Sequence, residues 1–316
     1  MLFRSIRCPV GLKNHIEAQI YSQYPDAEIF EVEDYVYKVP KNLPNAEWNV
    51  WGTTLAPNKP EAYPIRIYTQ FQEEVTGKMV DPMAGITEVF SSFTKGEYGW
   101  LQFVFDSATG KTWVPQAEAE LDKIAKKAKP AQMGVLESFF SNFGILVGNI
   151  FRGFFGGEMK TLEQPKSEEF SLFKMTPKEQ DAFKAINDKI SYNGYNTVIR
   201  YVYIAKREVF RKGLGVASLL GAMKQVNDTN LNSYLADSTT KTFAHYFFTE
   251  TRTQYRQRKI VNDYRGRDFA GLRKVLTAPE LATFYHFPDM SVKAANIQRV
   301  EAKKGEAPFN LPIEED

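Results

Sequence analysis

Apolar and polar residues alternate in residues 28–39 and 64–71, and a period of two predicts β-strands. Residues 100–105 and 197–205, both rich in apolar and aromatic residues, are predicted as strands too. Residues 100–105 (WLQFVF) are apolar on both faces, so we expect this strand in the centre of a sheet. Residues 38–63 are rich in Pro, Asn and Gly, which predicts a long loop with at most one short strand.

Other stretches carry apolar residues three and four positions apart, which predicts amphipathic helices. The expected helices cover residues 12–23, 81–93, 115–128, 177–190, 213–226, 245–263 and 279–287. Two of them have clear starting signals. Asp81 and Pro82 open one helix, and Thr176 forms a capping box with Glu179 at the start of another.

The order of capped helix, Gly-containing turn and aromatic strand occurs twice, in residues 81–105 and 176–205. We interpret this repeat as a duplication of a small unit. The predicted fold class is α+β, with two ferredoxin-like (split βαβ) units followed by a helical C-terminal segment. The predicted segments are a first α+β unit (1–130), an apolar connecting segment (131–166), a second α+β unit (167–242), a basic helical segment (243–290) and an exit linker (291–316).

Composition narrows the classes of function. The chain has 316 residues, enough for two domains, and 43% hydrophobic and 25% charged residues, as is ordinary for a soluble globular protein. The single cysteine, Cys8, excludes an internal disulfide framework and a multi-cysteine zinc site. His15, His245 and His286 lie far apart, without the spacing of a metal site. We therefore predict no catalytic residue, no metal and no cofactor.

The sequence also bears on location. The apolar part of the N-terminus is too short for a secretory signal, and no stretch reaches the ~20 apolar residues of a spanning helix. We expect a cytoplasmic protein, with peripheral contact at the inner face of the cytoplasmic membrane as an open possibility. Its oligomeric state stays open as well.

Residues 106–112 (DSATGKT) resemble the end of a phosphate-binding loop. The full motif requires a glycine at position 105, where this chain has Phe105, and Pro115 follows within a turn of Lys111. We therefore interpret the stretch as an exposed turn between a strand and a helix, and expect no ATP binding.

A dense basic block follows in the C-terminal third. Between positions 252 and 274 the chain has eight basic and two acidic residues, a net charge of +6, whereas the whole chain carries only +2. Arg252, Arg256 and Lys259 have the spacing of one exposed helix face. The predicted nucleic-acid or partner-binding residues are Arg252, Arg256, Arg258, Lys259, Arg265, Arg267, Arg273 and Lys274. The alternative is a solvated helix face without a partner.

Residues 135–156 form the most apolar stretch, with only Glu137 and Arg152 charged. Its stripe at helical spacing predicts a membrane or partner interface made of Leu136, Phe139, Phe140, Phe143, Val147, Ile150 and Phe154. The alternative is a connecting helix packed on the core. The uncharged run is too short to span a bilayer comfortably.

Five stretches carry a resemblance that covers nearly the whole chain: residues 19–35, 80–105, 189–210, 219–234 and 280–312. They resemble an uncharacterised protein family of small-genome uncultured bacteria. Its members look like the module placed ahead of, or encoded with, type IV secretion and conjugation ATPases of the HerA/TraD kind. The ending with YHFP and NLP is the most specific part.

In longer relatives a motor domain follows the matching ending, whereas this chain stops at Asp316, so the resemblance implies a separately encoded motor ATPase. Relatives also tend to carry extra sequence, often membrane-spanning, before the part that matches residues 2–7. The family offers no catalytic residues to transfer to this chain.

The predicted function is a non-enzymatic accessory module of a type IV secretion or conjugative DNA-transfer machine. It would dock a motor ATPase, DNA or both at the cytoplasmic side of the membrane. The first alternative is a free-standing, sequence-independent nucleic-acid-binding protein. The second is a hydrolase, which the scattered histidines disfavour.

Overall fold

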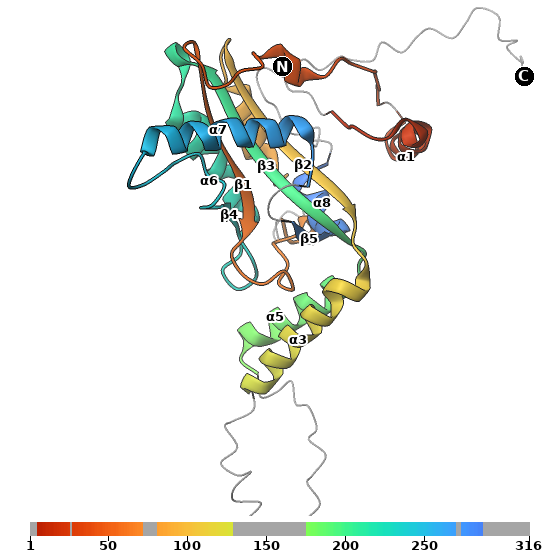
Figure 1. Cartoon of the computed structure of the whole chain (residues 1–316). Helices are drawn as coiled ribbons and strands as arrows, with labels where there is room; N and C mark the ends of the chain where they lie inside the picture. Colours follow the sequence, from red (N-terminus) through yellow and green to blue (C-terminus); the bar gives the residue numbers. More distant parts are fainter. Residues whose placement is uncertain (1–4, 26, 72–80, 129–174, 270–272, 287–316) are drawn as a thin grey trace, which may run out of the picture.

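The computed structural model describes residues 5–25, 27–71, 81–128, 175–269 and 273–286 (Figure 1). Its strands are β1 (Trp48–Pro57), β2 (Glu97–Ser107), β3 (Gly194–Lys206), β4 (Tyr234–Ala236) and β5 (Lys274–Thr277). Its α-helices are α1 (Lys13–Gln23), α2 (Ala84–Ser91), α3 (Gly110–Ala128), α5 (Pro177–Ile190), α6 (Leu219–Met223), α7 (Thr249–Gly266) and α8 (Ala278–Phe284). The predicted α+β class is confirmed.

The five strands form one antiparallel sheet, ordered β2-β3-β1-β4, with β5 paired to the first residues of β3. Strand β3 is central, because it pairs with β2 along one edge and with β1 and β5 along the other. Residues 198–205 of β3 are all buried. Their run of β-branched and aromatic side chains suits a strand that has neighbours on both edges and cover on both faces.

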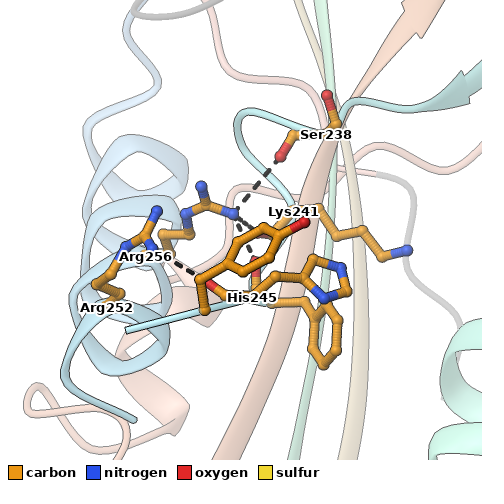
Figure 2. A pocket seen from close by; sticks show the side chains of 7 residues that line it. Ser238, Lys241, His245, Arg252 and Arg256 are labelled. Carbon is orange, nitrogen blue, oxygen red and sulfur yellow. Dashed lines mark hydrogen bonds between the residues drawn. The ribbon is translucent and has the colours of Figure 1, made fainter. Parts of the chain in front are cut away.

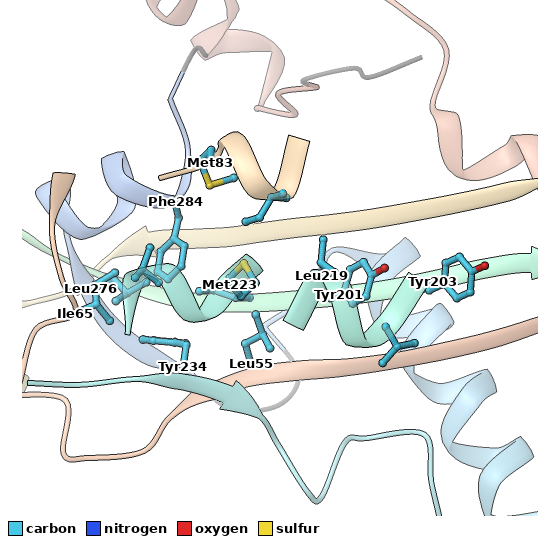
Figure 3. Packing of buried hydrophobic residues seen from close by; sticks show 14 of the residues in the cluster. Leu55, Ile65, Met83, Tyr201, Tyr203, Leu219, Met223, Tyr234, Leu276 and Phe284 are labelled. Atoms are coloured by element: carbon cyan, nitrogen blue, oxygen red, sulfur yellow. The ribbon is translucent and has the colours of Figure 1, made fainter. Parts of the chain in front are cut away.

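Helices α2, α6 and α8 cover one face of the sheet. Tyr201 and Tyr203 of β3 point to this face, where they pack in one cluster with Leu219 and Met223 of α6 (Figure 3). Phe284 of α8 closes the same cluster and is completely buried. Alternation along β3 therefore supplies the apolar surface on which these short helices rest.

Helix α7 lies across β1 and β3 on the opposite face (Figure 1). Val202 and Ile204, which alternate with the tyrosines of β3, point to this side and pack against Ile260, Val261 and Tyr264 of α7. A 3₁₀ turn (Tyr35–Lys38) covers the rest of the face. The molecule thus has three layers, with the sheet between two helical ones.

Helices α3 and α5 pack on each other beyond one end of the sheet (Figure 1). Their shared cluster includes Trp113, Leu121 and Ile186, all buried. The predicted capping box at the start of α5 is present, with Thr176 and Glu179 each satisfying the other's backbone N–H. Local sequence signals therefore suffice to begin α5, as expected for capping chemistry.

A buried ion pair ties α5 to the end of the sheet. The Nζ of Lys189 lies 3.0 Å from the Oε2 of Glu280, and both side chains are almost completely buried. Glu280 also accepts hydrogen bonds from the backbone N–H of Ile65 (3.1 Å) and of Thr277 (2.8 Å). This carboxylate therefore joins three separate segments, and the sequence analysis did not identify it.

Two predicted strands are wrong. Residues 27–34 have no regular structure and are followed by the 3₁₀ turn, while residues 64–67 are irregular and lead into a second 3₁₀ helix (Tyr68–Phe71). Side chains of the C-terminal segment take the backbone donors that a ladder would use. The N–H of Tyr68, for example, donates to the Oγ1 of Thr283 at 2.8 Å.

Two other strands differ from expectation in position. The stretch predicted as a long loop contains β1, whose eight ladder pairs with β3 make it a central strand. Strand β2, predicted to be central, lies at an edge of the sheet in the described residues. Its middle is covered on both faces: Trp100 stacks on Tyr264 of α7, and Gly99 lies against the ring of Phe93, just after α2. An apolar pattern reports covered faces, not a place in the strand order.

The predicted pair of ferredoxin-like units is not confirmed. Strands of both predicted units alternate within one sheet, and the segment predicted as helical contributes β5. The sequence repeat therefore describes similar local elements that share one core in the described residues. The segment boundaries themselves stay a prediction, and residues 131–166 and 291–316 lie outside the described residues.

Candidate nucleic-acid interface

Helix α7 carries most of the predicted basic block, and its inner side holds it on the sheet. Gln257, Ile260, Val261 and Tyr264 are buried, at spacings that place them on one face. The amide of Gln257 donates to the carbonyl of Val50 in β1 at 2.6 Å. These contacts fix which side of α7 is turned outward.

Tyr264 is the largest of these inner side chains. Its ring stacks on Trp100 of β2 at a centroid distance of 5.2 Å, and its hydroxyl lies 2.8 Å from that of Tyr35. Burial raises the pKa of Tyr264 well above its ordinary value, because a charged phenolate would lie away from water. The contact joins α7 to both the sheet and the 3₁₀ turn.

Arg256 points inward as well, toward the segment that precedes the helix (Figure 2). Its Nη1 donates to the backbone carbonyls of Lys241 at 3.1 Å and Phe243 at 2.5 Å, with a longer contact of 3.5 Å to Ser238. Arg252, one turn earlier, donates to the carbonyl of His245 at 3.0 Å. Arg256 therefore fastens a loop, and the exposed face expected for Arg252, Arg256 and Lys259 holds for Arg252 and Lys259 alone.

Arg265 and Arg267, at the end of α7, also make internal contacts. Arg265 donates to the carbonyls of Lys41 (2.6 Å) and Pro40 (2.8 Å). Arg267 forms an ion pair with Asp34 at 2.6 Å. Burial alone raises the pKa of Asp34, but hydrogen bonds from Arg267 and from a backbone N–H outweigh it and lower that pKa. Both arginines bind the N-terminal segment to the helix.

The last two predicted basic residues lie near β5. The guanidinium of Arg273 lies over the ring of Phe269, 4.8 Å from its centroid, and donates to its carbonyl. Lys274 pairs with Glu61 at 2.9 Å. The block that is continuous in sequence is therefore divided in space, with β5 separate from α7 (Figure 1).

What remains is the outer face of α7, which we define as Arg252, Tyr255, Arg258 and Lys259. All four side chains are exposed, and the Tyr255 residue is 66% exposed. Lys259 makes one ion pair within the helix, with Asp263 at 3.2 Å. The side chain of Arg258 makes no hydrogen bond or ion pair with another residue in the described ranges. The outer face combines three cations with one aromatic ring.

The sequence analysis did not identify the segment just before α7 as part of a site. Residues 243–248 (FAHYFF), here called the aromatic segment, carry Tyr246, Phe247 and Phe248 at 87%, 84% and 82% exposure. A pocket of about 310 Å³ lies beside them, lined by Ser238, Lys241, Phe243, His245, Tyr246, Arg252 and Arg256. The sequence feature that could have indicated this site is a run of three aromatic residues directly before a polar helix.

The other predictions concern a membrane or partner interface and metal binding. The apolar stretch with Leu136, Phe139, Phe140, Phe143, Val147, Ile150 and Phe154 lies outside the described residues. No helix in the described ranges is long and apolar enough to cross a membrane. Within the same ranges, no group of three His, Cys, Asp or Glu side chains is arranged to hold a metal ion.

The DSATGKT stretch connects β2 to α3 through only Ala108 and Thr109, because α3 begins at Gly110. The helix thus starts earlier than expected and includes Pro115. Two connecting residues are too few to wrap a phosphate as the glycine-rich loop of nucleotide-binding proteins does.

Comparison with protein-family models matches residues 10–300 to DUF8128, a domain of unknown function. The match spans most of the chain, so the chain belongs to this family. No curated protein and no solved structure matches it. The prediction of an uncharacterised family is confirmed, while the link to secretion and conjugation ATPases remains a proposal.

Proposed function

We propose that this member of the DUF8128 family is a non-enzymatic accessory module of a DNA-transfer machine related to type IV secretion, and that it docks DNA through the outer face of α7. The observation that carries the proposal is the division of α7 into two sides. One side is packed on the sheet, and the other presents Arg252, Arg258 and Lys259 around the exposed ring of Tyr255.

The spacing of these residues suits a phosphate backbone. Arg252, Tyr255 and Lys259 lie three and four positions apart, so they form one stripe along the helix, with Arg258 beside it. Each cation that contacts a phosphate releases condensed counterions, which makes binding favourable and salt-dependent. Contacts of this kind position a protein on DNA without reading its sequence.

The secretion setting rests on the sequence resemblance and not on the geometry of α7. In that setting a separately encoded motor ATPase is the second partner, and the module acts at the cytoplasmic side of the membrane. The alternative function, a free-standing nucleic-acid-binding protein, uses the same outer face without a motor. Recovery of an ATPase with the tagged chain from its native cells separates the two.

The test of DNA docking is a salt titration in which binding of a labelled DNA duplex is monitored by fluorescence anisotropy. Wild type should show a log–log slope near −3, about −0.9 for each of three phosphate contacts. The triple variant Arg252→Glu, Arg258→Glu and Lys259→Glu should lose about tenfold or more in affinity at 50 mM salt, because three contacts become repulsive. Arg256 is left intact, since it makes three contacts to the preceding loop, whereas Arg252 makes one, to the carbonyl of His245.

A matched control changes the net charge of the protein by the same amount, at positions away from α7. Lys111 on α3 and Lys178 and Lys184 on α5 are all exposed, so their triple change to Glu alters the charge equally without touching α7. This control should lose far less affinity than the α7 variant. Absence of DNA binding at low salt, or an equal loss in both variants, would contradict the proposal.

A further inference from the structure

The aromatic segment exposes more apolar surface than a chain normally leaves in water. Phe247 and Phe248 have no polar group, yet both are over 80% exposed, and Tyr246 next to them is the most exposed of the three. An aromatic side chain buries roughly 150–250 Å² when it is covered. A contiguous exposed patch of this kind is typical of an interaction site.

The backbone of the segment is held in an uncommon conformation. Tyr246 and Phe248 have φ angles of 67° and 53°, in the left-handed region that residues with a side chain seldom adopt. Such residues cost on the order of 1–3 kcal/mol each and occur mostly where the surrounding structure imposes them. Here Arg252 and Arg256 of α7 donate to the carbonyls of His245 and Phe243, on the N-terminal side of the rings (Figure 2).

The pocket beside the rings is positively charged. Lys241, Arg252 and Arg256 line it together with His245, and its lining contains no carboxylate. The hydrogen bonds of Arg252 and Arg256 to the loop carbonyls use only the Nη1 atom of each guanidinium, whereas a guanidinium has five N–H donors. Lys241 forms no ion pair with any residue of the described ranges. The site therefore offers several hydrogen-bond donors to an anion next to exposed rings.

We propose that the aromatic segment and its pocket bind single-stranded nucleic acid, with bases stacked on Tyr246, Phe247 and Phe248 and a phosphate at Lys241 and Arg252. This inference rests on the proposed DNA docking by α7 and narrows its substrate to the unpaired strand. Bases in a duplex are stacked on one another and leave no free face for a protein ring, whereas an unpaired strand offers every base.

The arrangement along α7 favours a strand over a lipid surface. Tyr255 lies seven residues after Phe248, about 10 Å along the helix, with Arg252 between them and Arg258 and Lys259 beyond. Rings and cations thus alternate along one line, as bases and phosphates do along a strand. Insertion into a membrane interface would instead gather the apolar side chains at one depth, with cations around them.

The experiment compares a labelled 20-nucleotide oligo-dT with a 20-base-pair duplex, using the full chain at one salt concentration. Wild type should bind the single strand about tenfold or more tightly than the duplex. The double variant Phe247→Leu and Phe248→Leu keeps apolar side chains but removes the rings. It should lose about fivefold to 150-fold in oligo-dT affinity for each base that stacks, and change duplex affinity less than twofold. Phe30→Leu, at another residue that is 72% exposed, is the matched control and should change neither.

A spectroscopic readout reports stacking directly. All four tryptophans of the chain are buried, so an exposed tryptophan introduced as Phe247→Trp can be distinguished from them. Its fluorescence should be quenched by oligo-dT and much less by the duplex. Quenching that is equal for the two nucleic acids would overturn the proposal.

The remaining outcomes separate this inference from the proposed function. If neither nucleic acid binds, both fail. If the α7 charge reversal abolishes binding but the leucine pair retains full oligo-dT affinity, DNA docking stands and the stacking proposal is overturned. If the variant Phe247→Ser and Phe248→Ser loses binding to vesicles with 30% anionic phosphatidylglycerol, and wild type shows no preference for the single strand, the aromatic segment is a lipid contact instead.

Discussion

Arg256 and Arg258 are two positions apart in the same helix, yet they belong to regions with opposite roles. Arg256 lies on the inner side of α7 and donates to carbonyls of the preceding loop, whereas Arg258 on the outer face projects into solvent. The same division separates Arg265 and Arg267, which hold the N-terminal segment, from Lys259. A count of basic residues in sequence thus overstates the charge that the surface offers to a partner.

Inward cations also occur outside the basic block. Arg200 of β3 is completely buried, donates to the backbone carbonyl of Asp268 at 2.7 Å, and forms an ion pair with its carboxylate at 3.2 Å. Lys189 of α5 pairs with Glu280. If inward cations hold the fold and outward ones bind partners, substitutions in the first group should change stability and those in the second should change affinity.

The largest effect is expected for Lys189→Met. Removal of the ammonium leaves Glu280 buried without its counter-ion, which typically costs about 3–5 kcal/mol in free energy of unfolding. Urea unfolding followed by tryptophan fluorescence measures this loss. Lys184→Met, an exposed position on the same helix, is the control and should change the free energy by less than about 0.5 kcal/mol. Equal stability of the two variants would contradict an internal role for Lys189.

The second-largest effect is a dependence of the free energy of unfolding on pH that arises from Glu97. Burial alone raises the pKa of this carboxylate, but hydrogen bonds from Arg211, Tyr203 and Thr94 outweigh it and lower the pKa from 4.5 to about 2. The charged form is therefore favoured in the folded state, and its contribution is complete above pH 4.5 and lost as the pH falls toward 2. The loss should be on the order of 3 kcal/mol, at 1.36 kcal/mol per pKa unit.

Tyr203, which donates a hydrogen bond to Glu97, adds a dependence of stability on pH at the alkaline side. Burial and the hydrogen bond to Glu97 (2.5 Å) raise the pKa of Tyr203 to about 12. The neutral hydroxyl is favoured in the folded state, so this contribution is complete below pH 10 and lost as the pH rises from 10 toward 12. The denaturant midpoint, measured between pH 2 and 4.5 and between pH 10 and 12, tests the contributions of Glu97 and Tyr203. In the variant Glu97→Gln, stability should change much less as the pH falls from 4.5 toward 2. If this variant loses stability with falling pH as steeply as wild type, Glu97 is not the titrating group.

A smaller loss is expected for Arg256→Ala. The substitution removes the side-chain donor to the carbonyl of Phe243 and one of the two donors to the carbonyl of Lys241, which also accepts from the N–H of Phe243 at 2.7 Å. The free energy of unfolding should fall by about 1–2 kcal/mol. Because these carbonyls lie next to the aromatic segment, amide hydrogen exchange of residues 241–248 should also become faster. Exchange that stays at the wild-type rate would show that Arg256 does not hold this loop.

The smallest effect on stability is expected for Arg258→Ala, within about 0.5 kcal/mol of wild type. The same variant should reduce the salt slope of DNA binding by about one unit, because one phosphate contact is lost. Arg258 and Arg256 thus give opposite patterns in the two assays. A change in stability at Arg258 as large as that at Arg256 would remove the distinction between the two sides of α7.

Several elements were predictable from local sequence. The capping box of α5 and the strand TVIRYVYIA were found because their signals lie within a few residues of each other along the chain. Helix α7 was expected at residues 245–263 and extends over Thr249–Gly266. Helical periodicity and capping act over one or two turns, so neighbouring residues contain the information.

Other elements were not predictable in this way. Strand β1 was hidden in a stretch with turn-forming residues, and it becomes a strand because β3 supplies its ladder partners from about 150 residues further along the chain. Residues 64–71 alternate like a strand but form an irregular stretch and a 3₁₀ helix, because Glu280 and Thr283 of α8 accept the backbone N–H groups of Ile65 and Tyr68. Their partners are distant in sequence, so no local pattern reports them.

For the candidate site, the sequence by itself determined that a basic helix follows a run of aromatic residues. It did not determine which side of that helix is buried, since polar Gln257 is on the inner side with Arg256 while Tyr255 is exposed. Only the tertiary structure decided this, because the inner side chains found carbonyl and carboxylate partners in the preceding loop, in β1 and in the N-terminal segment. A buried polar group needs such a partner, so the inner side of α7 is held by the fold, and the outer face with its exposed cations is the side left to bind another molecule.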